Sequence, residues 1–82
     1  MADFSKIPVQ TIEGNEEYID IRKPLGNALY YKSQDLAGSE LGRKIYLSTG
    51  NIDITDKEKE LVKEMCDNMF AYVTRNAIIK SL

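Results

Sequence analysis

Residues 25–46 read LGNALYYKSQDLAGSELGRKIY, and one short pattern occurs in them twice, as LGNALY at 25–30 and LGRKIY at 41–46. Glycine stands second in both copies, within segments whose apolar spacing is typical of a helix. A glycine inside a helix costs about 0.5 to 1 kcal/mol relative to alanine. The role that the two glycines serve in return for this cost decides whether the stretch is an anion site, a nucleic-acid site or a packing device.

A phosphate-binding loop needs several glycines bunched before a helix, so that backbone N–H groups converge on the anion. Neither GxxxxGK[ST] nor GxGxxG is present in the chain. The remaining reason for a helical glycine is the close approach of another backbone. We therefore expect the two short helices to cross closely, or to seat against the strands, at Gly26 and Gly42.

The boundaries of these two helices follow from local signals. Pro24 suits the first turn of a helix, which we expect to end near Ser33. Residues 34–38 read as a loop, Ser39 as the N-cap of the second helix, and Gly50 as its stop.

Residues 22–52 carry five basic side chains against two acidic ones, which raises the question of DNA binding by a helix-turn-helix. The predicted connection, residues 33–38, is longer than the usual 3 to 4 residues, and the second helix has no Asn or Gln to read bases. Nucleic-acid binding therefore stays as the alternative function. Its candidate contacts are Arg22, Lys23, Lys32, Arg43 and Lys44.

The first part of the chain alternates apolar and polar residues around the turn at residues 13–16, which predicts two antiparallel strands at 7–12 and 17–21. A two-stranded hairpin is marginal alone, so it must pack on helices or extend the sheet of a partner. Residues 52–54 could add a third short strand. The fold class is α+β: an N-terminal β-hairpin packed on three to four α-helices.

The clearest local signal is Thr55-Asp56-Lys57-Glu58, a capping box that begins a helix. Apolar residues then recur at helical spacing almost to Leu82. An unbroken helix of that length would extend roughly 40 Å, against a diameter near 30 Å for a globule of this size. We expect a break at Asp67-Asn68, followed by a helix over residues 69–80.

The chain has 82 residues, one cysteine and no histidine. This length suits a single domain, residues 1–82, with one small core. A disulfide within the chain is excluded and a zinc site is disfavoured. The usual general base is missing, and Cys66 falls on or beside the apolar stripe, so we expect neither catalysis nor a cofactor, metal or small-molecule substrate.

The net charge of −2 argues against bulk attraction to nucleic acid or to an anionic membrane. Five acidic residues and one lysine occupy residues 1–21. No apolar run approaches the roughly 20 residues that span a bilayer, and MADFSKIPVQ lacks the apolar region of a signal peptide. We expect no membrane association and a cytoplasmic location.

A core this small cannot enclose every aromatic side chain, so some of them should form a contact surface. The candidates for that surface are Tyr30, Tyr31, Tyr46, Phe70 and Tyr72. We expect the protein to work by binding a protein partner, above all another copy of itself.

Residues 19–55 also carry a resemblance, through Ile19-Asp20-Ile21-Arg22-Lys23, LGNALY, ELGRKIY at 40–46 and Ile52-Asp53-Ile54-Thr55. The combination resembles small uncharacterised proteins of prophages and other mobile elements from Bacteroides-type gut bacteria, over residues 19 to about 80. The shared motifs are structural and imply no reaction. The resemblance implies an accessory protein, in particle assembly or as a small regulator.

Overall fold

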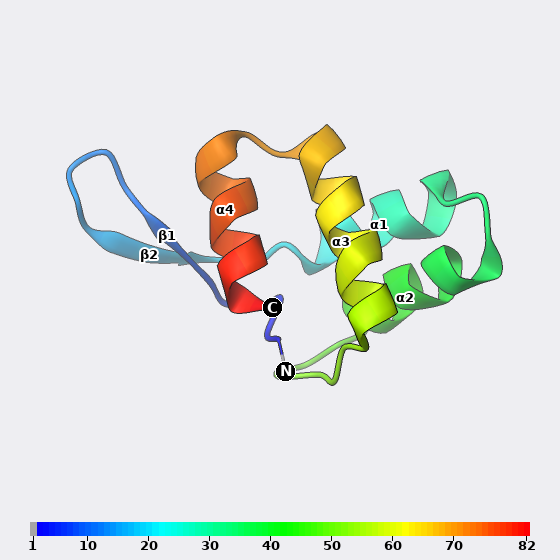
Figure 1. Cartoon of the computed structure of the whole chain (residues 1–82). Helices are drawn as coiled ribbons and strands as arrows, with labels where there is room; N and C mark the ends of the chain where they lie inside the picture. The colour runs from blue at the N-terminus through cyan, green and yellow to red at the C-terminus, as the bar shows by residue number, and fades with distance from the viewer. Residues whose placement is uncertain (1) are drawn as a thin grey trace.

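Two strands and then four helices make up the fold in the computed structural model, which describes residues 2–82 (Figure 1). The elements are β1 (Ile7–Gln10), β2 (Glu16–Ile19), α1 (Arg22–Lys32), α2 (Leu36–Tyr46), α3 (Asp56–Met69) and α4 (Tyr72–Ser81). The two strands are antiparallel. The predicted α+β class, with a hairpin ahead of four helices, is confirmed.

Helices α1 and α2 form an antiparallel αα-hairpin with a three-residue connection, residues 33–35. Their contacts run in opposite order along the two helices. The hydroxyl of Ser39 donates to the carbonyl of Tyr30 near the connection at 3.2 Å, and the guanidinium of Arg22 donates to the carbonyl of Ser48 at the far end at 2.6 Å. The two helices therefore lie side by side along their whole length.

Between those two ends the backbones meet at the two glycines. A Cβ on Gly42 would lie 2.5 Å from the amide nitrogen of Tyr30 and 2.6 Å from the carbonyl oxygen of Gly26. A Cβ on Gly26 would lie 2.9 Å from the carbonyl oxygen of Gly42 and 2.8 Å from the Cβ of Tyr46. Ordinary contacts of a Cβ are 3.4 Å or longer, so neither site has room for a side chain. The packing role predicted for both glycines is confirmed.

The start of α2 differs from the prediction. The helix begins at Leu36, because the Asp35 carboxylate caps it and accepts from the backbone N–H of Gly38 at 2.9 Å. Ser39, the predicted N-cap, lies inside the helix. Residues 36–38 belong to α2 as well, so the predicted loop 34–38 was too long.

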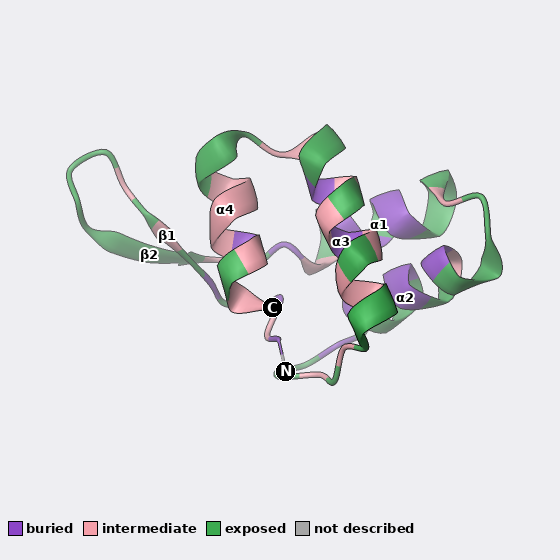
Figure 2. Cartoon of the chain, in the orientation of Figure 1, coloured by how far each residue is buried: buried purple, intermediate pink, exposed green. Residues whose placement is uncertain are grey.

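One core joins all parts of the fold. Helix α3 packs across both α1 and α2, and α4 packs between α3 and β1. Figure 2 shows buried segments in α1, α2 and α3. The core consists of Ala2, Phe4, Ile7, Ile21, Leu25, Leu29, Leu41, Ile45, Val62, Cys66 and Ile78.

The N-terminal segment supplies a core residue that the sequence pattern did not reveal. Phe4 is fully buried, and its carbonyl accepts from the backbone N–H of Ile21 at 2.9 Å. Ala2 forms an isolated antiparallel bridge with Ile52. The open question of a third strand is therefore answered within residues 2–82: residues 52–54 make this single bridge and do not pair with the β-hairpin.

The β-hairpin is shorter than predicted, and its tip extends away from the helices (Figure 1). Ile7 lies opposite Ile19 in the register and is buried. The turn depends on Gly14, whose φ of 89° is a left-handed conformation that glycine adopts readily. Ile12, two residues before that glycine, is 100% exposed.

The C-terminal helices confirm one prediction and shift another. The capping box is present: Glu58 N–H donates to Thr55 Oγ1 at 3.1 Å, and Thr55 N–H donates to Glu58 Oε1 at 2.9 Å. The break lies at residues 70–71 instead of 67–68. The side chain of Asn68 donates to the carbonyl of Glu64 at 3.1 Å within the helix, and α3 ends where Phe70 packs against the core.

We predict that Gly42→Ala lowers the free energy of unfolding by about 1 to 3 kcal/mol, because the new methyl group would meet backbone atoms that cannot move aside cheaply. Gly42→Leu should cost more. Asn27→Ala is the matched control, an exposed position on α1 where we expect a change within about 0.5 kcal/mol. Chemical denaturation followed by circular dichroism measures both. Equal stability of Gly42→Ala and the wild type would contradict the close packing.

Candidate functional site

A groove of about 380 Å³ lies along the outer seam of α1 and α2. Its lining residues are Gly26, Asn27, Tyr30, Tyr31, Gly42, Arg43, Tyr46 and Leu47. We call this the tyrosine groove. It brings together three of the five aromatic residues predicted to form a contact surface.

The tyrosine groove is a consequence of the glycine packing. Gly26 and Gly42 carry no side chain, so the two backbones come into contact and form the floor of the groove. Tyr30 and Tyr46 each follow a glycine by four residues, one helical turn, and therefore stand on the same face as that glycine. The ring of Tyr31 meets that of Tyr30 edge to face, with centroids 5.0 Å apart.

All three tyrosines of the groove are exposed to solvent. Tyr31 is 77% exposed, and Tyr30 and Tyr46 are 48% and 41% exposed. Leu47, at the end of the same groove, is also exposed. Exposed tyrosines on a rigid backbone are typical of protein contact surfaces, since they offer large area at low entropic cost.

The other two predicted aromatic residues lie elsewhere. Phe70 is partly buried and packs against the core, so it does not belong to a free surface. Tyr72 is exposed on α4, where the guanidinium of Arg75 lies 5.8 Å from the centre of its ring. Neither residue reaches the tyrosine groove.

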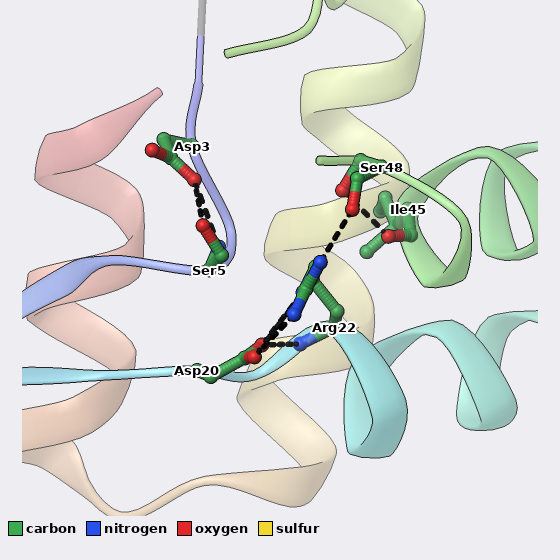
Figure 3. A network of polar contacts seen from close by, with 6 residues as sticks. All are labelled: Asp3, Ser5, Asp20, Arg22, Ile45 and Ser48. Carbon is green, nitrogen blue, oxygen red and sulfur yellow. Dashed lines mark hydrogen bonds and ion pairs between the residues drawn. The ribbon is translucent and has the colours of Figure 1, made fainter. Parts of the chain in front are cut away.

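Two of the five basic candidates are occupied within the fold. Arg22 pairs with the Asp20 carboxylate at 2.7 Å and donates to the carbonyl of Ser48 (Figure 3). Lys44 donates to the carbonyl of Asp53 and lies 3.6 Å from the carboxylate of Glu58. Both sets of contacts lie at the end of the αα-hairpin opposite the connection.

Lys23, Lys32 and Arg43 are exposed, and none of them forms an ion pair with residues 2–82. Only Arg43 lines the tyrosine groove. The three-residue connection overturns one argument against a helix-turn-helix, because that length is usual for the motif. The antiparallel register is a stronger argument against it, since helix-turn-helix pairs cross at about 90 to 120°.

A second hollow, of about 460 Å³, lies between the α1–α2 connection and α3. Most of its lining residues are polar or charged, and the charged ones carry both signs: Lys32 is basic, and Asp35 and Glu64 are acidic. It offers a mixed polar surface with little exposed apolar area.

The titratable groups give little sign of catalytic chemistry. Cys66 is fully buried, and burial raises the pKa of its thiol to about 12, so the reactive thiolate is scarce near neutral pH. Over residues 2–82, His, Cys, Asp and Glu side chains form no group of three placed to hold a metal ion. The same part of the chain contains no helix with the length and apolar character needed to cross a bilayer.

Sequence reasoning missed several exposed apolar side chains, and two of them, Leu47 and Ile12, matter for the candidate site and its surroundings. Leu47 directly follows the second LGxxxY pattern and caps α2 at its C-terminus. Ile12 interrupts a polar turn, and a β-branched apolar residue at a turn was the available signal.

We predict that acid sensitivity of the fold depends in part on Asp20. Its hydrogen bonds from Arg22 hold the pKa of this carboxyl below its usual value of 3.8. A carboxyl group whose pKa is lower in the folded than in the unfolded protein stabilises the fold at pH values above its unfolded pKa. This contribution is lost as the pH falls through the folded pKa. Thermal melts from pH 7 to pH 3 should therefore show a smaller loss for Asp20→Asn than for the wild type. Parallel curves would contradict this role.

Comparisons with protein-family models, with curated proteins and with solved structures find no match to this chain. The functional conclusion therefore depends on the geometry of the tyrosine groove and on the charges around it.

Proposed function

We propose that this protein is a binding module that associates with further copies of itself through the tyrosine groove, and that it carries no catalytic activity. The single observation that carries the proposal is the groove itself: three exposed tyrosines around a floor of closely packed glycine backbone.

The rigidity of the floor supports this proposal. Gly26 and Gly42 hold the two helices backbone to backbone, so the groove is formed before any partner arrives. A preformed site loses little conformational freedom on binding. Tyrosine side chains add large contact area and are frequent hot spots of interfaces.

The size of the chain favours another copy as the partner. At 82 residues, without a disulfide, the domain has only one small core. Small domains of this kind often gain stability from association. We propose this role in preference to nucleic-acid binding, because Arg22 and Lys44 are already engaged within the fold.

The resemblance to proteins of prophages and mobile elements adds a biological setting to the proposal. A self-associating module without catalytic chemistry suits an accessory protein in particle assembly. This setting rests on the segments that carry the resemblance, among them LGNALY and ELGRKIY.

Sedimentation equilibrium tests the proposal. We expect the average mass of the wild type to rise between about 10 µM and 1 mM, the range of a small interface. Tyr31→Ala should weaken association by about tenfold, because it removes an aromatic anchor. Tyr72→Ala is the matched control, an exposed tyrosine outside the groove, and should behave as the wild type. A wild type that stays monomeric throughout would end the proposal.

A further inference from the structure

We infer that the occupant of the tyrosine groove is the tip of the β-hairpin from a second copy, so that the molecules join head to tail. This inference rests on the proposed self-association and specifies its partner surface. We call residues 11–17 the hairpin tip.

The hairpin tip offers one apolar anchor in a fixed conformation. Ile12 is 100% exposed, more than any other large apolar side chain among residues 2–82. The turn around it is ordered by hydrogen bonds: the N–H of Thr11 donates to the carbonyl of Asn15 at 2.7 Å, and the N–H of Gly14 to the carbonyl of Thr11 at 3.0 Å. An exposed anchor on an ordered turn binds with a small loss of entropy.

The hairpin tip cannot occupy the groove of its own molecule. Strand β1 packs against α4, and neither strand approaches α1 or α2. In Figure 1 the tip and the connection between α1 and α2 lie at opposite ends of the molecule, whose longest dimension is 40 Å. A contact between tip and groove must therefore join two molecules.

The charges of the two surfaces are complementary. Glu13, Glu16 and Glu17 belong to the hairpin tip together with Ile12, and all three are exposed. The tyrosine groove contains Arg43, which forms no ion pair within residues 2–82, and no acidic residue lines it. Opposite charges steer such surfaces together and fix their orientation.

The same charges disfavour symmetric contacts. Two hairpin tips brought together would place six glutamates in one small interface, and two grooves would place two copies of Arg43 there. The tip-to-groove contact avoids both arrangements. Because the two surfaces of this contact differ, one molecule of a dimer keeps a free tip and the other keeps a free groove. Association therefore continues beyond a dimer into a ring or an open chain.

Two single-surface variants test this inference. Ile12→Asp removes the anchor of the hairpin tip and leaves the groove intact. Arg43→Glu reverses the charge of the groove and leaves the tip intact. Both positions are exposed, so we expect unchanged melting curves. At a concentration where the wild type associates, each variant alone should be monomeric, with affinity reduced about tenfold or more.

An equimolar mixture of the two variants is the decisive sample. It contains one intact tip and one intact groove, so we expect a 1:1 complex that stops at twice the monomer mass. Ile12→Val serves as the control and should associate as the wild type does. If Arg43→Glu melts early, Tyr31→Ala replaces it as the groove variant.

The outcomes separate this inference from the proposed function. A monomeric wild type would reject self-association itself. An associating wild type whose Ile12→Asp variant associates equally well would overturn the inference and leave self-association standing. A mixture that stays monomeric, beside an associating wild type, would overturn it too, because tip and groove would then not be partners.

Discussion

The contact between the backbones of Gly26 and Gly42 is the constraint on which the rest of the molecule depends. It sets the distance between α1 and α2 to a value that no residue with a Cβ allows. The two helices then contribute Leu25, Leu29, Leu41 and Ile45 to the core that they share with α3. On the outer side the same contact leaves the hollow that becomes the tyrosine groove. Core and candidate site are thus two sides of one helix pair.

Much of this arrangement could be predicted because its signals are local. The capping box at Thr55 needs only four residues, and the alternation on either side of Gly14 needs only a dozen. The glycines were informative for a related reason: a helical glycine has a cost, and close packing is the usual explanation. Tyr30 and Tyr46 then follow from helical spacing alone.

The features that escaped prediction depend on contacts between distant residues. Asp35 and Ser39 are both acceptable N-caps, and their sequence context does not rank them. When α2 starts at Leu36, Gly38 lies against the side chain of Ser33, where a Cβ would not fit. The break at residues 70–71 reflects the packing of Phe70 on the core, which outweighs the low helix propensity of Asp67 and Asn68. Phe4 belongs to no periodic pattern, so only the fold reveals its burial.

The most direct test of the central claim is a nuclear Overhauser measurement between the α-protons of Gly42 and the amide proton of Tyr30. One α-proton of Gly42 points where a Cβ would lie 2.5 Å from that amide nitrogen. The close approach of the helices predicts a strong cross-peak between these protons. If the peak is absent while those of the surrounding helical residues are present, the two backbones do not meet at the glycines and the account is wrong.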